Sequence, residues 1–383
     1  IAVGAASQLT LREEKGAFEA LRKFAEETQD WLFGYLTYDL KNDVENLTSS
    51  HFDGIGFPAL HFFQPVYLLE IFADQVVIHS KAESPEMLFQ KINRPVSTSS
   101  ANRSGLPQKI LAPRIPKPDY LATVQAIRQH ILRGDIYEMN FCQEFFTQNA
   151  ELDPAAIFHR LSRLAKAPFS AFYRLNDRYL LCASPERFLK KTGDLLVSQP
   201  IKGTIRRGKT AAEDERLRAQ LLASQKDRSE NVMIVDLVRN DLHRSCRAGS
   251  VQVEELFGVY PFEQVFQLIS TVTGRLKSGL QWVDALRNAF PMGSMTGAPK
   301  VRGMELIEQV EKTKRGLYSG AVGYVTPGGD FDFNVVIRSI FYNSASRYVS
   351  LQVGGAIVFD SVPEQEYEEC LVKAKAMFEV LRA

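Results

Sequence analysis

The stretch GAVGYVTPGGDFDFNVVIRSIFYNSASRYVSLQVGGAIVF, residues 320–359, decides the fold of this chain. It contains three segments of strand composition, at 320–326, 331–342 and 348–359, with short turn-forming stretches between them. Strands in such hairpin-like groups are typical of antiparallel sheet. The stretch therefore predicts that antiparallel pairing dominates the fold.

The sequence outside this stretch follows the same plan. Strand composition recurs at 170–182 and 188–197, and earlier in WLFGYLTYDL and PVYLLEIFADQVVIHS. Because helices stand between groups of strands, the sequence predicts an α+β fold with mostly antiparallel sheet, rather than parallel βαβ units. The predicted helices cover 119–133, 213–243, 282–290, 301–313 and 363–381.

One change of composition divides the chain. Residues 94–118, RPVSTSSANRSGLPQKILAPRIPKP, are rich in Pro and Ser and lack apolar periodicity, which predicts a linker. The division leaves an N-terminal region at 1–93, which contributes sheet strands, and a larger region at 119–383.

Composition excludes several classes of protein. The 383 residues are 45% hydrophobic, which excludes global disorder, and 46 Lys+Arg against 45 Asp+Glu argue against a nucleic-acid partner. No apolar run approaches the roughly 20 residues that span a bilayer, so no membrane association is expected. The four cysteines lie far apart, which favours reduced thiols in a cytoplasmic protein over disulfides or a zinc site.

Two predicted helices carry acidic pairs at (i, i+3) spacing. In the first, Glu230 lies near the centre of an apolar stripe, with Asp227 at its edge. In the last, Glu366 lies on the shoulder of the stripe and Glu369 further round. A salt bridge, or an acidic first turn favoured by the helix dipole, would explain either pair alone. Together they also suit magnesium, which prefers carboxylate oxygens and keeps water positions open.

Four further motifs have both an ordinary and a functional interpretation. GSMTGAPK at 293–300 fails the spacing of a phosphate loop, but its amides could still face an anion. Gly354 and Gly355 suit either a β-bulge or a close approach to a carboxylate. Lys202, in PIKGT, is either a surface charge or a nucleophile whose pKa is depressed by an apolar turn. Glu186, in SPERF, is either a turn carboxylate or a catalytic acid.

The order of the motifs resembles that of the chorismate-utilising enzymes, which include anthranilate, aminodeoxychorismate, isochorismate and salicylate synthases. The motifs are SPERF, PIKGT, SENVMIVDLVRNDL, FPMGSMTGAPK, GAVGYVT with VVIRS, and GGAIVFDSVPEQEYEECLVKA. The resemblance is dense over 119–383 and thinner over GYLTYDLKNDVENL. It implies two large, mostly antiparallel β-sheets facing each other and wrapped by helices, with a chorismate-binding catalytic region at 119–383.

The resemblance also implies roles for individual residues. Glu230 and Glu369 match magnesium ligands, supported by Asp227 and Glu366, with the metal bridging to the ring carboxylate of chorismate. Glu186 matches the general acid that protonates the departing ring hydroxyl. The implied substrate contacts are Tyr324 and Arg338 at the enolpyruvyl carboxylate, Gly354, Gly355, Ala356 and Lys373 at the ring carboxylate, and Ser294 and Thr204.

Lys202 separates the branches of the family. Anthranilate synthases carry PIAGT, whereas PIKGT is typical of aminodeoxychorismate synthases, in which the lysine is thought to attack the ring before ammonia displaces it. The resemblance therefore implies amination of chorismate to 4-amino-4-deoxychorismate, the precursor of 4-aminobenzoate and folate, with ammonia from a glutamine amidotransferase subunit. The alternatives are an anthranilate synthase component I and a non-catalytic partner of an amidotransferase. Glu138 stands where the family has Gln or Lys, and Gln267 where His is usual.

Overall fold

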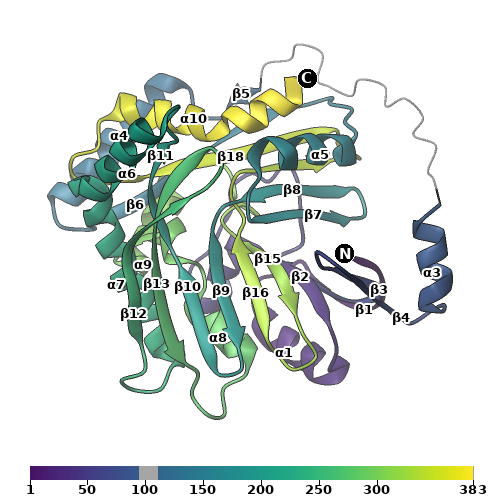
Figure 1. Ribbon diagram of the computed structural model, residues 1–383. Helices are drawn as coiled ribbons and strands as arrows, with labels where there is room; N and C mark the ends of the chain where they lie inside the picture. Colours follow the sequence, from purple (N-terminus) through teal and green to yellow (C-terminus); the bar gives the residue numbers. More distant parts are fainter. Residues whose placement is uncertain (95–110, 383) are drawn as a thin grey trace.

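Two antiparallel sheets dominate the computed structural model, which describes residues 1–94 and 111–382 (Figure 1). The larger sheet has 11 strands and the smaller has seven, and every strand pair within them is antiparallel. The predicted α+β class, with facing sheets wrapped by helices, is confirmed.

The larger sheet runs β1-β3-β2-β15-β16-β9-β10-β13-β11, and β4 and β12 pair with β3 and β13. Its strands are β1 (Ala2–Leu11), β2 (Leu32–Leu36), β3 (Leu60–Ile71), β4 (Val76–Ser80), β9 (Arg187–Thr192), β10 (Leu195–Gln199), β11 (Ile201–Arg206), β12 (Gln252–Pro261), β13 (Val265–Arg275), β15 (Ala321–Val325) and β16 (Phe331–Val335). Because β2 pairs with β15, the N-terminal region shares this sheet with the rest of the chain.

The smaller sheet runs β14-β6-β18-β17-β8-β7, and β5 pairs with β6. Its strands are β5 (Ala112–Pro113), β6 (Glu138–Thr147), β7 (Phe169–Leu175), β8 (Arg178–Ser184), β14 (Gly297–Ala298), β17 (Ser339–Asn343) and β18 (Tyr348–Ile357). Of the predicted linker, residues 95–110 lie outside the described residues. The remainder holds β5 and the start of α4 at Lys117, two residues before the predicted start of that helix.

Helices cover the outer surfaces of both sheets. They are α1 (Ala17–Thr28), α2 (Lys41–Val44), α3 (Pro85–Ile92), α4 (Lys117–Leu132), α5 (Pro154–Ala165), α6 (Ala211–Ala223), α7 (Gln225–Ser245), α8 (Trp282–Ala289), α9 (Lys300–Val310) and α10 (Pro363–Arg382), with 3₁₀ turns η1 (Tyr38–Leu40) and η2 (Gly293–Met295). Among the helices that the structure describes, none combines the length and apolar character that crossing a bilayer requires.

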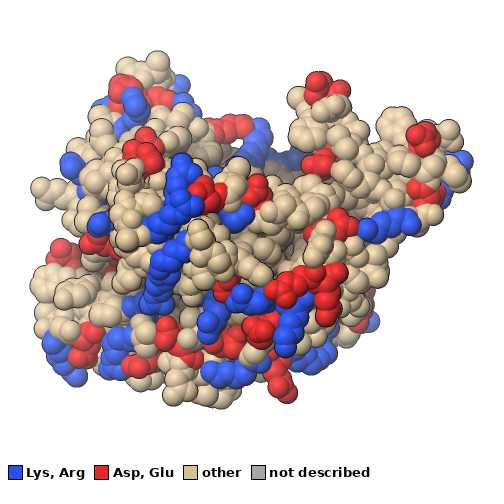
Figure 2. Space-filling view, turned by 90° about the horizontal axis from the view of Figure 1, so that it is seen from below, with Lys and Arg blue, Asp and Glu red and all other residues tan. Residues whose placement is uncertain are grey.

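Two apolar cores hold these layers together. The larger lies between the sheets, where Phe62 and Phe333 of the first sheet share a buried cluster with Leu180 and Phe341 of the second. The other lies between the smaller sheet and α4, α5 and α10. Burial of this apolar surface is the main force that fixes α10 over β18. On the face seen in Figure 2, Lys and Arg alternate with Asp and Glu, as the near-zero net charge predicts.

The chain crosses between the sheets at two places that matter for the site. It leaves β8 in the smaller sheet and enters β9 in the larger through Pro185 and Glu186, and it returns from β16 to β17 through residues 336–338. The single strand predicted at 331–342 is therefore wrong. The chain bends at Arg338, whose φ of 52° lies in the left-handed region that bulky residues rarely adopt.

The long helix predicted at 213–243 is also two helices. Ser224 separates α6 from α7, and its hydroxyl accepts a hydrogen bond from the Asp227 N–H at the start of α7. This new start changes the helical phase, and Leu222, which a continuous helix would place on the same stripe as Glu230, is exposed at the end of α6. The buried stripe of α7 includes Glu230, Ile234 and Val238 instead.

Candidate active site

A buried lysine lies at the centre of the site. Lys202 is 9% exposed on β11, and its Nζ lies 2.6 Å from Glu138 Oε1 and 3.9 Å from Glu230 Oε2. The predicted turn at this point is a strand with a register shift between Ile201 and Thr204. Within the shift, a Cβ on Gly203 would lie 3.0 Å from the Asp227 side chain, so glycine lets β11 approach α7 closely.

The charge around Lys202 differs from what the sequence predicted. Burial acts to lower the pKa of Lys202, but Glu138 and Glu230 outweigh it and hold that pKa above its ordinary value. The expectation of a depressed pKa is therefore wrong, because the residues closest to the amine are carboxylates. Arg206 and Arg207, the next cations along the chain, pair with Glu213 and Asp214 of α6.

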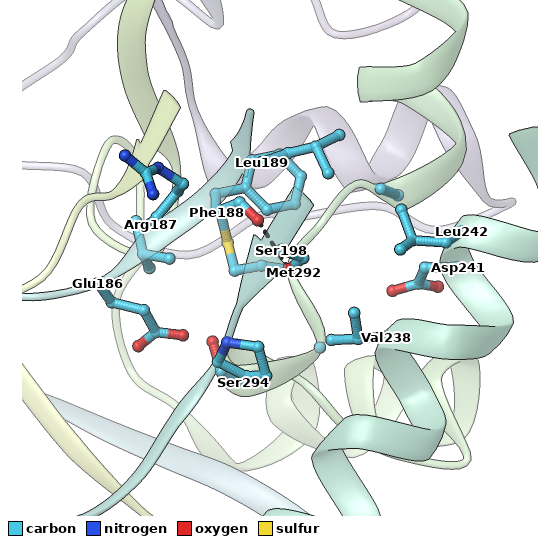
Figure 3. A pocket seen from close by; sticks show the side chains of 14 residues that line it. Glu186, Arg187, Phe188, Leu189, Ser198, Val238, Asp241, Leu242, Met292 and Ser294 are labelled. Atoms are coloured by element: carbon cyan, nitrogen blue, oxygen red, sulfur yellow. Dashed lines mark hydrogen bonds between the residues drawn. The ribbon is translucent and has the colours of Figure 1, made fainter. Parts of the chain in front are cut away.

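Glu186 lies at the first crossing between the sheets. It is 6% exposed, and burial raises its pKa to about 7, against the lowering effects of the Ser294 hydroxyl, Lys202 and Lys373. Figure 3 shows Ser294 close to the Glu186 carboxyl. A carboxyl with this pKa is about half protonated at neutral pH, so a substantial share is in the acid form that a general acid requires.

Carboxylates from α7 and α10 converge on a single ammonium group. Glu230 Oε1 and Glu366 Oε1 each lie 3.9 Å from Lys226 Nζ. Glu366 also accepts a hydrogen bond from Ser361, and burial raises the pKa of both glutamates, that of Glu230 to about 7. Lys226 was not predicted as a site residue, because in the sequence it is an ordinary charged residue in the first turn of a helix.

The donor chemistry of this acidic cluster suits magnesium, because its carboxylate oxygens surround a position that the Lys226 ammonium group occupies. In the part of the chain that the structure describes, no three or more His, Cys, Asp or Glu side chains are already arranged as a metal site. Glu369 instead pairs with Lys373 at 2.6 Å. A divalent ion would therefore have to displace the lysines from these carboxylates.

Two cations beside β18 could receive an anionic substrate. Lys373 Nζ donates a hydrogen bond to the Gly354 carbonyl at 2.7 Å, and Arg338 Nη1 donates to the Lys373 carbonyl at 3.3 Å. Among described residues, no carboxylate forms a salt bridge with Arg338, which leaves most of its guanidinium for a ligand.

The two glycines of β18 have different roles. They lie with Ala356 in regular pairing with β6, not in a bulge. A Cβ on Gly354 would lie 2.4 Å from the Phe141 carbonyl, so Gly354 permits close packing of the strands. A Cβ on Gly355 would lie 3.2 Å from Glu366 Oε2, so Gly355 keeps space open in front of the acidic cluster.

Two predicted substrate contacts do not join this group. Tyr324 is exposed on β15 and packs against Trp31 and Phe33. Its partner in β16, Asp332, lies four residues before the crossing at Val336, which is about 13 Å along the strand. A different tyrosine, Tyr318, is buried and close enough to Arg338 to raise the pKa of that guanidinium against the larger, lowering effect of burial. Thr204 is exposed on β11 and pairs in register with Gln267.

The chain matches the family described as chorismate binding enzyme over residues 2–379, and it belongs to that family. It is 35% identical over 368 residues to aminodeoxychorismate synthase component 1 of Bacillus subtilis (strain 168), covering 91% of this chain and 76% of that protein. It is 40% identical over 284 residues to the chloroplastic aminodeoxychorismate synthase of Arabidopsis thaliana, covering 73% of this chain and 30% of that one. The chain thus spans most of the bacterial relative and less than a third of the plant relative.

A solved structure supports the same assignment. The crystal structure of anthranilate synthase component I from Streptococcus pneumoniae TIGR4 superposes with a TM-score of 0.87 at 26% identity, covering 98% of this chain and 91% of that one. The fold predicted from the motifs is therefore that of the family. Relatives named aminodeoxychorismate synthase also favour the amination prediction over the anthranilate alternative.

Proposed function

We propose that this chain is a magnesium-dependent transferase that aminates chorismate to 4-amino-4-deoxychorismate in the cytoplasm, with ammonia from a glutamine amidotransferase partner. The observation that carries the proposal is the position of Lys202. Its amine is buried between Glu138 and Glu230 and within electrostatic reach of Glu186. The relatives named for the same synthase, and four buried cysteines that are all free thiols, agree with it.

The proposed chemistry assigns the acid and the nucleophile to separate residues. Glu186 gives its proton to the departing ring hydroxyl, which leaves as water. Lys202 loses a proton, for which Glu138 at 2.6 Å is the nearest acceptor, and its neutral amine attacks the ring. Ammonia then displaces the lysine amine from the ring, and the ammonium group formed on the product loses one proton to become the neutral amine. Each turnover thus exchanges a hydroxyl for an amine with no net change in protons.

The remaining site residues bind and orient the substrate. Arg338 and Lys373 supply positive charge for its two carboxylates, and Gly355 leaves room for the ring. Glu230 and Glu369 would hold magnesium, with Asp227 and Glu366 in support. When bound, the ion supplies positive charge to the ring carboxylate.

Product analysis tests this proposal directly. The protein is incubated with chorismate, magnesium and ammonium, and the product is identified by mass spectrometry. We expect 4-amino-4-deoxychorismate. Anthranilate would contradict the argument from Lys202, and unchanged chorismate would favour a non-catalytic partner of an amidotransferase.

A further inference from the structure

A small internal cavity begins at the proposed general acid and extends away from the nucleophile. Glu186 and Ser294 line one part of it and Asp241 another, with Val238 between them (Figure 3). Lys202 is not among its lining residues. The cavity volume is about 20 Å³, which is enough for one or two water molecules, since each needs roughly 10–15 Å³ measured in this way.

Polar groups stand at both ends of this cavity. Ser294 Oγ is buried and close enough to Glu186 to lower the pKa of that carboxyl, yet it makes no well-formed hydrogen bond to a described protein group. At the other end, Asp241 on α7 pairs with Lys300 Nζ at 2.7 Å, and Lys300 also donates to the Ala289 carbonyl. A water in the cavity would give the Ser294 hydroxyl the partner it lacks.

Glu186 needs a route by which a proton can return to it while substrate covers the site. A general acid loses its proton in every turnover and must regain it before the next. Glu186 is 6% exposed, and the groups that influence it, Ser294, Lys202 and Lys373, belong to the site that the substrate would cover. The Asp241–Lys300 pair is buried but lies outside that site, and it is within electrostatic reach of Arg244 and Glu45, whose side chains are 43% and 26% exposed, so this end of the cavity approaches solvent.

We propose that this cavity holds a water-mediated proton relay from Asp241 and Lys300 to Glu186. Lys300 gives a proton to Asp241 and regains one from solvent. Asp241 passes the proton to the cavity water, and the Ser294 hydroxyl accepts it from the water while donating its own proton to the Glu186 carboxylate. One proton arrives at Glu186 for each one given to the departing hydroxyl. No electrons are transferred, and Asp241 and Lys300 return to their starting states.

Filling the cavity tests the relay. Val238→Ile adds one methylene to its lining, and the matched control, Val235→Ile, makes the same change at a buried position of α7 outside the lining. We expect Val238→Ile to lower kcat about tenfold, which is less than the roughly 10²–10⁴-fold that general acid catalysis contributes in full, and to raise the solvent deuterium isotope effect on kcat. The KM for chorismate should match the parent in both variants. Thermal unfolding measures the cost of the added methylene, which should be no larger in Val238→Ile than in the control.

A second variant addresses the far end of the cavity. Asp241→Asn with Lys300→Gln replaces the ion pair by amides, which can hydrogen-bond but cannot carry the extra proton, and it leaves no unpaired buried charge. We expect the same loss of kcat and the same rise in the isotope effect, with chorismate binding retained. Equal kcat and isotope effects in Val238→Ile and its control would overturn the relay. A rise confined to the KM for ammonium would also overturn it, because the cavity would then carry ammonia.

The relay rests on the proposed function, but the two can fail separately. Turnover is followed as loss of chorismate, whichever product forms. A different product from the parent protein would refute the proposed amination while the comparison of Val238→Ile with Val235→Ile still decides the relay.

Discussion

Replacing Lys202 by alanine should destabilise the protein in metal-free buffer as well as abolish amination. The lysine balances Glu138 at 2.6 Å and Glu230 at 3.9 Å, and both glutamates are buried. Removing one partner of a buried ion pair costs about 3–5 kcal/mol, because it leaves uncompensated charge. At about 2.1 cal/mol/K of unfolding entropy per residue, 383 residues convert this loss to a Tm lower by roughly 4–6 °C.

The loss should depend on pH in a defined direction. The pKa of Glu230 is already about 7 beside the lysine, and it rises further without it. At pH 8 the lone carboxylates must stay charged or take up protons at a cost, whereas at pH 6 Glu230 is protonated and the penalty shrinks. Lys202→Ala combined with Glu138→Gln removes one of the two charges and should recover most of the stability at pH 8.

Thermal unfolding of both variants and the parent at pH 6 and pH 8, with a chelator present, measures these differences. Product analysis with chorismate and ammonium completes the test, because neither variant should form the 4-aminated product. If Lys202→Ala alone were as stable as the parent at pH 8, the ion pair would contribute nothing to stability. Amination at the parental rate by Lys202→Ala would remove the lysine from the covalent route.

Three further predictions follow from the buried groups. Chorismate turnover should fall as pH rises through about 7, because burial raises the pKa of Glu186 to that value and the acid form is needed. A flat pH profile for kcat from pH 6 to 8.5, or full activity in Glu186→Gln, would exclude Glu186 as the general acid. Glu230→Gln should abolish magnesium-dependent turnover without lowering Tm in metal-free buffer, because Lys202 keeps its closer partner; a large loss of Tm would make Glu230 a structural residue. Burial lowers the pKa of His61 to about 4, so between pH 6.5 and pH 4 the imidazole is protonated in the unfolded chain but not in the folded chain. Urea titrations should therefore show the free energy of unfolding falling by up to roughly 3 kcal/mol as pH falls from 6.5 to 4. His61→Gln should flatten that slope and the exposed His79→Gln should not; equal slopes in both would contradict the assignment.

Local sequence patterns predicted most of the fold but not the places where the chain crosses from one sheet to the other. The strand composition at 170–182 and 188–197 and the periodicity of the last helix depend only on near neighbours. Each of those two stretches is a hairpin, β7 with β8 and β9 with β10, where the sequence predicted one strand. The split between β16 and β17 could not be predicted in this way, because residues 331–342 have strand composition throughout and only the separation of the two sheets forces the bend. Strands β6 and β12 were not predicted, because their sequences mix charged and apolar residues without clean alternation. Strand β13 was also not predicted, although VFQLISTVTGR has strand composition.

The site shows the same limit on prediction. Its acids could be located from sequence, because a carboxylate on an apolar stripe stands out. The direction of the pKa shift at Lys202 could not be predicted, because it depends on Glu138, which is 64 residues away in the sequence. Tyr324 and Tyr318 carry the same kind of side chain, and only the strand geometry shows that Tyr318 is the one near Arg338.

The two crossings between the sheets explain why the chemistry lies where it does. Residues inside a sheet have their backbone groups committed to neighbouring strands, and their side chains point to one face or the other. Where the chain leaves one sheet for the next, a side chain can point into the space between the layers. Glu186 is at one crossing and Arg338 at the other. Glu186 is buried and Arg338 is partly buried, and among the described residues neither side chain forms a salt bridge. The strain of φ 52° at Arg338 is what a site tolerates when the position of one guanidinium matters more than local stability.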